Sequence, residues 1–153
     1  MNPFRFEKEI AAFEEEDRRN PPRSGVILFT GSSSITHWNR QLPADMAPLP
    51  VVGRGFGGST MADLLEVAER IIPPWVPRAV VVYEGDNDLA AGRTVEAVAG
   101  DFDRQAHSCQ HRLGDLLVDG IVLRQQYAAG QPFRRNTGHG RVLCFRDRRG
   151  GRG

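Results

Sequence analysis

Three short apolar strands, each followed at once by small or polar residues, constrain this chain more than any other feature. Residues 26–30, 50–53 and 79–83 have the pattern of buried strands, because they are short, apolar and rich in β-branched side chains. Helical patterns separate them, and this alternation predicts right-handed βαβ units and a parallel sheet. The carboxyl ends of the three strands would then share one edge, where open α/β sheets bind ligands.

The helical patterns between the strands have recognisable ends. Residues 4–18 place apolar side chains on one face and glutamates on the other, and residues 20–22 (Asn-Pro-Pro) stop that pattern. Thr60 is predicted to cap a helix that ends before Pro73, and Thr94 is predicted to cap another that runs beyond residue 100.

Composition excludes several classes of protein. A chain of 153 residues suits one domain, and 40% hydrophobic with 25% charged residues is ordinary for a soluble globular protein. The net charge of +1 gives no reason to expect nucleic acid as a partner. No run of 18 apolar residues predicts a membrane span, and the first residues lack a secretory signal, so a cytoplasmic protein is expected. Cys109 and Cys144 have no metal-binding spacing and are expected to be reduced thiols, so neither a metal nor a cofactor is predicted.

The residues after each strand allow more than one interpretation. The turn Gly31–Ser34 can cap a helix, cradle a phosphate or expose a nucleophilic serine. Gly58 can serve a turn that needs a positive φ, or let backbone N–H groups approach a ligand. Asn87 can form an Asx-turn, or its amide can donate to an oxyanion. Parallel strands would bring all three turns together.

In order along the chain, these turns resemble blocks I, II and III of the SGNH/GDSL ester hydrolases. The strings are Gly31-Ser32-Ser33-Ser34-Ile35, Gly55-Phe56-Gly57-Gly58 and Gly85-Asp86-Asn87-Asp88. The resemblance implies a flavodoxin-like three-layer α/β/α fold with a parallel sheet, and a small-molecule ester as substrate. By the same match Ser33 is the nucleophile and supplies one oxyanion donor through its own N–H. The Gly58 N–H and the Asn87 side chain are the other two donors. Two positions depart from the pattern, since Ser32 replaces the usual Asp and Gly53 replaces the usual Asn.

The proton acceptor that the resemblance implies, a His in a C-terminal Asp-x-x-His string, is absent from this sequence. In the nearest look-alike, which begins at Asp119, Val122 stands where the His belongs, and valine accepts no proton. The chain has four histidines, His37, His107, His111 and His139. His37 follows Ser33 by one helical turn and is interpreted as a solvated or packing residue, while His139 has no acidic neighbour to orient it.

The chain changes character after about residue 104. All nine glutamates lie at or before Glu96, and residues 101–153 hold ten arginines against five acidic residues. We therefore divide the chain into an N-terminal helix and linker (1–24), an incomplete SGNH/GDSL-like domain (25–104) and a divergent, poorly ordered Arg/Gly-rich tail (105–153). Either this tail has diverged, or its coding frame has shifted; the second is favoured.

The expected function is therefore that of a serine ester hydrolase that is weak or inactive because its base is missing. Two alternatives stay open at this point. The chain can be a non-catalytic module that binds a phosphate or small anion at Gly31–Ser34, although Asp86 and Asp88 nearby argue against an anion. It can also be a truncated or frameshifted product without function. Nothing in the sequence predicts its oligomeric state.

Overall fold

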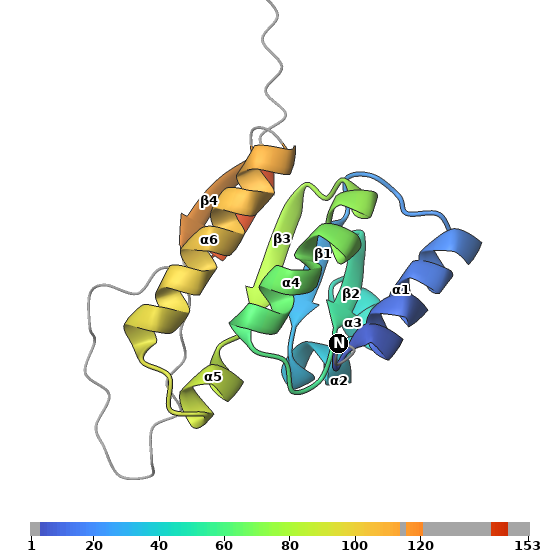
Figure 1. Ribbon diagram of the computed structural model, residues 1–153. Helices are drawn as coiled ribbons and strands as arrows, with labels where there is room; N and C mark the ends of the chain where they lie inside the picture. The colour runs from blue at the N-terminus through green and yellow to red at the C-terminus, as the bar shows by residue number, and fades with distance from the viewer. Residues whose placement is uncertain (1–3, 114–115, 121–141, 147–153) are drawn as a thin grey trace, which may run out of the picture.

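A computed structural model describes residues 4–113, 116–120 and 142–146 of the chain (Figure 1). Twelve elements follow one another in these ranges: α1 (Glu7–Arg19), β1 (Ile27–Gly31), α2 (Ser33–Trp38), α3 (Leu42–Asp45), β2 (Val51–Gly55), α4 (Met61–Ile71), the 3₁₀ helix η1 (Pro73–Trp75), β3 (Ala79–Tyr83), α5 (Asp86–Ala90), α6 (Val95–Leu113), β4 (Leu116–Gly120) and β5 (Val142–Arg146).

The three strands predicted from the sequence form the parallel part of the sheet. The strand order is β2-β1-β3-β5-β4, and β1 pairs in parallel with both β2 and β3. Leu28 lies opposite Val52 on one side and Val80 on the other. The predicted α/β fold with adjacent parallel strands is confirmed, and the carboxyl ends of β1, β2 and β3 share one edge.

The other two strands depart from an all-parallel sheet. β5 pairs antiparallel with β3, with Val81 opposite Leu143, and β4 pairs antiparallel with β5. The short apolar runs at residues 116–118 and 121–123 also have the composition of a strand; the first lies in β4, and the second lies outside the described residues. β5 was not expected, because its segment has no periodic pattern of its own and pairs with a strand more than 60 residues earlier in the chain.

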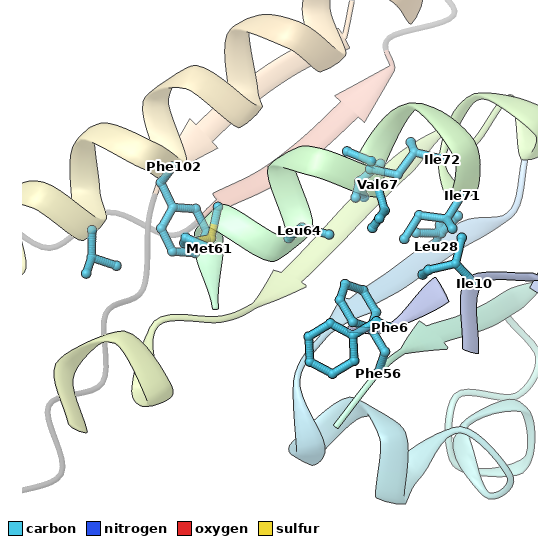
Figure 2. Close-up of a cluster of buried hydrophobic side chains, with 13 residues drawn as sticks. Phe6, Ile10, Leu28, Phe56, Met61, Leu64, Val67, Ile71, Ile72 and Phe102 are labelled. Carbon is cyan, nitrogen blue, oxygen red and sulfur yellow. The ribbon is translucent and has the colours of Figure 1, made fainter. Parts of the chain in front are cut away.

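Side chains that alternate along the strands pack into two apolar layers. Leu28 and Val80 face the larger core, which α1, α4 and α6 cover; Figure 2 shows its side chains. The neighbouring residues Phe29 and Val81 face the opposite side, against α2 and α3. Helices on both faces of the sheet give the three layers that were predicted. Each residue buried in the larger core is apolar, and several are fully buried, including Ile10, Leu28, Leu64 and Val80.

The helices begin where the sequence predicts. Thr60 and Asp63 form a capping box at the start of α4, since each side chain binds the other residue's backbone N–H. Thr94 Oγ1 accepts a hydrogen bond from the Ala97 N–H at 3.2 Å, as expected of an N-cap for α6. These local bonds fix where α4 leaves the edge of the sheet.

Two expectations about the ends of the chain stay predictions. The boundary placed between residues 104 and 105 falls inside α6, so the structure offers no break there. Most of the predicted tail lies outside the described residues. In the ranges that are described, no helix is long and apolar enough to cross a membrane.

Candidate active site

Ser33 is presented at the carboxyl end of β1, as the first residue of α2. Gly31 ends the strand with φ of 141°, and the Ser32 N–H donates to the Tyr83 carbonyl oxygen of β3 at 3.2 Å. The Ser32 side chain is buried, whereas that of Ser33 is exposed. The Ser32 carbonyl oxygen accepts from the N–H groups of Ile35 and Thr36, which begins the helix. The turn therefore directs one serine inward and leaves the next accessible to a substrate.

The glycine turn after β2 lies against this serine. The Phe56 N–H donates to the Gly31 carbonyl oxygen at 2.9 Å, which joins the two turns. A Cβ atom built on Gly57 would be 3.9 Å from the Cα of Ser33. Gly58 has φ of +84°, and a Cβ atom there would meet nothing within 4 Å. The predicted block II glycine is thus exposed, and the glycine before it, Gly57, is the one that lies near the predicted nucleophile.

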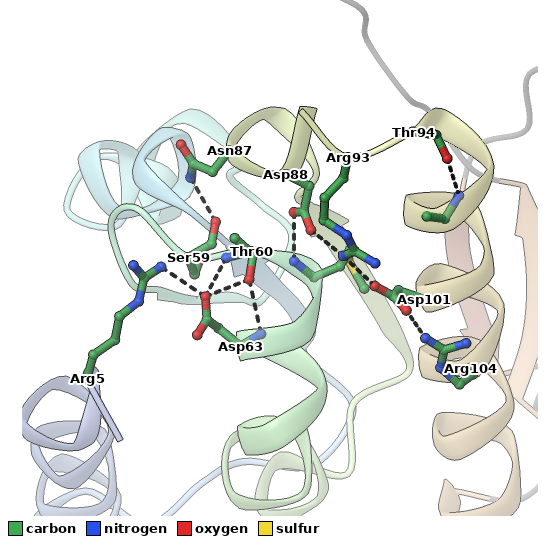
Figure 3. Close-up of polar contacts among 12 residues, drawn as sticks. Arg5, Ser59, Thr60, Asp63, Asn87, Asp88, Arg93, Thr94, Asp101 and Arg104 are labelled. Atoms are coloured by element: carbon green, nitrogen blue, oxygen red, sulfur yellow. Dashed lines mark hydrogen bonds and ion pairs between the residues drawn. The ribbon is translucent and has the colours of Figure 1, made fainter. Parts of the chain in front are cut away.

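Asn87 contacts the turn that follows β2. It lies on α5, which follows β3, and its Nδ2 donates to the Ser59 carbonyl oxygen at 2.8 Å (Figure 3). A side-chain amide carries two N–H groups, so this bond uses one donor and leaves a second. The structure therefore places Ser33 beside Gly57, and Asn87 on the residue that follows Gly58. All three predicted site residues lie on the turns that follow β1, β2 and β3.

A buried carboxylate fixes α5 against the start of α4. Asp88 is fully buried, and its Oδ2 accepts from the Met61 N–H at 2.9 Å. Its Oδ1 pairs with Arg93 at 2.6 Å, and the same Arg93 nitrogen pairs with Asp101 of α6 (Figure 3). Sequence reasoning used Asp88 only as part of a motif and missed this structural role. The signal available was its place directly after Asn87 in a strand-to-helix turn.

Glu84 is the second buried acid that sequence reasoning missed. It directly follows β3 and is 5% exposed, and its Oε1 accepts a hydrogen bond from the Ser59 hydroxyl. Burial raises the pKa of this carboxyl from 4.5 to about 8, hydrogen bonds from Ser59 and Ser32 lower it, and the charges of Asp88 and Asp63 raise it. A glutamate at the end of the most apolar strand was the signal in the sequence.

An arginine from the N-terminal segment holds the Gly58 turn from outside. Arg5 donates to the Gly58 carbonyl oxygen at 2.6 Å. It also donates to Asp63 Oδ2 at 2.9 Å (Figure 3). Asp63 also accepts from the Thr60 N–H and hydroxyl, so one carboxylate joins the N-terminal segment to the first turn of α4. Nothing in the sequence indicates that Arg5 contacts Gly58 and Asp63.

Of the four histidines, the structure describes the side chain of His37 alone. His37 is exposed on α2, one turn after Ser33, in agreement with its interpretation as a solvated residue. His107 and His111 lie on α6, and His139 lies outside the described residues, as does Val122. In the part of the chain that the structure describes, no group of three His, Cys, Asp or Glu side chains could hold a metal ion.

Several solved structures resemble the fold of this chain, although no protein-family model and no curated protein matches its sequence. A GDSL-like lipase from Bacteroides thetaiotaomicron superposes with a TM-score of 0.60 at 17% identity, over 74% of this chain and 60% of that one. A proposed acylhydrolase from Bacteroides fragilis gives 0.57 at 17% identity, over 80% and 60%. The chain has the fold of the GDSL-like hydrolases.

A third neighbour in fold has a different description. It is a proposed platelet activating factor protein from Streptococcus pneumoniae, with a TM-score of 0.60 at 18% identity, over 79% of this chain and 58% of that one. At such identities the likeness establishes the fold, so the chemistry has to be argued from the residues of this chain. The chain spans about three fifths of the length of each of these structures.

Proposed function

We propose that this chain is a GDSL-type serine ester hydrolase domain of low intrinsic activity. In this proposal the Ser33 hydroxyl attacks the carbonyl carbon of an ester and forms a tetrahedral intermediate. The N–H groups of Ser33 and Gly58, with the free N–H of the Asn87 amide, stabilise its oxyanion. The Ser33 proton passes to solvent water, the bond from the carbonyl carbon to the alkoxy oxygen breaks, and the alcohol leaves after taking a proton from water. A further water molecule then hydrolyses the acyl-enzyme and restores the Ser33 hydroxyl.

The observation that carries the proposal is the convergence of three turns from three strands. The Phe56 N–H binds the Gly31 carbonyl oxygen, and a Cβ atom built on Gly57 would lie 3.9 Å from the Ser33 Cα. The Asn87 amide binds the carbonyl of Ser59, the residue after Gly58. Separate contacts thus join block I to block II and block II to block III. An oxyanion requires donors within about 2.7–3.1 Å of one point, and only turns that meet at one edge can supply them.

The charges around the turns favour a neutral ester over a phosphate. Asp88 is buried behind the start of α4, Asp63 lies beside Thr60, and Glu84 lies between the turns. Of these, Asp88 and Asp63 have an arginine as ion-pair partner. A bound phosphate would bring further negative charge beside the carboxylates of Asp88 and Asp63, whereas an ester brings none until its transition state.

Low activity follows from the missing proton acceptor. The sequence contains no Asp-x-x-His, and His37, the histidine nearest to Ser33 along the chain, points to solvent. Groups that act as a triad are strongly non-additive, and sites that lack one member retain only about 10³–10⁴-fold catalysis over water. The cytoplasmic location stays an expectation from the sequence.

A fluorophosphonate probe tests the nucleophile directly. We expect slow labelling that mass spectrometry locates on Ser33 and that disappears in Ser33→Ala. Ser34→Ala is the matched control, because Ser34 is the neighbouring exposed serine on the same helix, and this variant should keep the label. Labelling at Ser34 instead, or none at Ser33 under prolonged exposure, would refute the proposal.

Turnover of p-nitrophenyl acetate tests the missing base. We expect a feeble rate that Ser33→Ala hardly changes. A chimera whose C-terminal third is replaced by one with Asp-x-x-His, taken from a GDSL-like lipase, should be faster by orders of magnitude, and Ser33→Ala should abolish that gain. A high rate in the unaltered chain, lost in Ser33→Ala, would show that one of its own histidines already serves as the base.

A further inference from the structure

Glu84 is the buried titratable group that the proposed chemistry does not use. It is 5% exposed, its Oε1 accepts from Ser59, and its Oε2 has no hydrogen-bond partner in the described part of the chain. A buried carboxyl with an unsatisfied oxygen is costly, since the group has lost its hydrogen bonds to water without replacing them. Such a group calls for an explanation at its own position.

Its position is between the turns that form the candidate active site. Ser59 directly follows Gly58, and its hydroxyl binds Glu84 while its carbonyl binds Asn87. On the other side, the Ser32 N–H binds the carbonyl of Tyr83, the residue before Glu84, and Ser32 precedes Ser33. Glu84 therefore connects, through one neighbour on each side, the residues proposed as nucleophile and oxyanion donor.

We propose that Glu84 is a positioning residue, whose neutral carboxyl holds the Gly58 turn in place, beside the Ser33 turn, through the Ser59 hydroxyl. The inference rests on the proposed function and adds a requirement to it, namely that the carboxyl stays uncharged. A negative charge at this position would oppose the oxyanion that develops beside the same turns.

The surroundings of Glu84 keep it neutral near pH 7. Its pKa is raised to about 8, chiefly by burial, with smaller contributions from the charges of Asp88 on α5 and Asp63 on α4. The two nearby arginines are engaged elsewhere, because Arg93 pairs with Asp88 and Asp101, and Arg5 with Asp63. The serine hydroxyls favour the charged form, but less than burial opposes it.

The test compares the rate of fluorophosphonate labelling at Ser33 between pH 6 and pH 10. Glu84→Gln keeps the shape and the neutrality of the protonated carboxyl, so it should label at the wild-type rate at pH 6. As pH rises through about 8, the wild-type protein should label several-fold more slowly than this variant. Glu66→Gln, the same change on the exposed face of α4, should follow the wild type at every pH.

A second measurement requires no reactivity. In NMR titrations of the full chain, the Glu84 carboxyl carbon and the Gly58 amide should titrate with one shared midpoint near pH 8. The Gly58 titration should vanish in Glu84→Gln. If Glu84→Gln does not fold, Ser59→Ala provides the test, because it removes a hydroxyl that lowers the pKa of Glu84. In Ser59→Ala the titration midpoint of Glu84 should move upward, and the Gly58 amide should no longer titrate with it.

The outcomes separate this inference from the function on which it rests. A Gly58 amide that does not follow Glu84, or a labelling ratio that stays constant from pH 6 to pH 10, would overturn the positioning role. If Ser33 is never labelled in any variant, the proposed hydrolase function fails, and the NMR titration still decides whether Glu84 positions the turn.

Discussion

Helix α4 joins two regions of the molecule that are buried in different ways. Along its length, Leu64, Val67 and Ile71 pack into an apolar core with the sheet and α1. At its first turn, buried contacts are made by polar groups instead, such as Asp88 on the Met61 N–H. Burial of apolar surface stabilises a fold wherever it occurs, whereas each buried polar group requires a partner.

The two regions contribute differently: apolar burial along α4 stabilises the fold, and the polar edge holds the groups of the candidate site. Along α4 the buried side chains pack on apolar neighbours, whereas the carboxyl edge keeps four buried polar side chains, Ser32, Ser59, Glu84 and Asp88. A protein selected for stability alone would replace such groups by well-packed apolar ones, often at no loss. Their concentration at the one edge where three turns meet supports a functional origin.

The largest expected effect comes from a truncation in the apolar region. Leu64→Ala should lower the free energy of unfolding by about 2–5 kcal/mol, because it leaves a cavity in a fully enclosed core. Leu65→Ala is the matched control: Leu65 is only half-buried on the same helix and should cost clearly less. Urea denaturation measures both, and equal losses would show that the core under α4 is less tightly packed than described.

A smaller loss is expected at the polar edge. Asp88→Asn should destabilise by about 2–3 kcal/mol, because it removes the charge that faces Arg93 and weakens the bond to Met61. Arg93 is 35% exposed, so water compensates part of the loss. Asp103→Asn, at an exposed position of α6, should be nearly neutral in the same urea titration. A neutral Asp88→Asn would mean that α4 does not depend on this carboxylate.

The pH dependence of stability separates the two regions further. The pKa of Glu84 is about 8 in the folded protein, against an ordinary value of 4.5. Between pH 4.5 and pH 8, the carboxyl is therefore protonated in the folded state and ionised in the unfolded state. Its contribution is complete below about pH 4.5 and is lost as pH rises through about 8. Between pH 6 and pH 7 the wild-type protein should lose about 1.4 kcal/mol more than Glu84→Gln. Parallel stability curves for the two proteins would contradict a raised pKa.

The smallest effect is expected at the surface of the site. Arg5→Ala should change the free energy of unfolding by about 0.2–1 kcal/mol, because Arg5 is 57% exposed and its pair with Asp63 is screened by solvent. It should nevertheless speed hydrogen exchange at the Gly58–Thr60 amides, since Arg5 binds the Gly58 carbonyl. Arg40→Ala, on an exposed residue after α2, controls for loss of charge. An unchanged exchange rate would show that the turn holds its position without Arg5.

Local signals explain how much of the fold could be predicted from the sequence. The three parallel strands were found because buried strands are continuous apolar runs, and the start of α4 because Thr60 and Asp63 cap it within four residues. The expectation that Ser33, Gly58 and Asn87 share one edge of the sheet came from a topological rule, which places the carboxyl ends of parallel strands together.

The missing parts depend on contacts between distant segments. Glu84 is buried by turns that lie about 25 and 50 residues earlier in the chain, and Arg5 reaches a carbonyl 53 residues away. The pairing of β5 with β3 spans more than 60 residues. Periodicity and capping patterns extend over a few residues only, so they carry no information on such partners.

The close approach of β1 to β3 at Gly31 has a consequence for how this site can evolve. A Cβ atom built on Gly31 would lie 1.9 Å from the Tyr83 carbonyl oxygen, whereas one built on Gly58 would meet no atom within 4 Å. In a library that randomises both turns, position 31 should therefore return glycine alone. Position 58 should also return asparagine, which tolerates positive φ at modest cost. Adaptation to new substrates would then proceed through the second turn, while the first stays invariant and preserves the location of the serine.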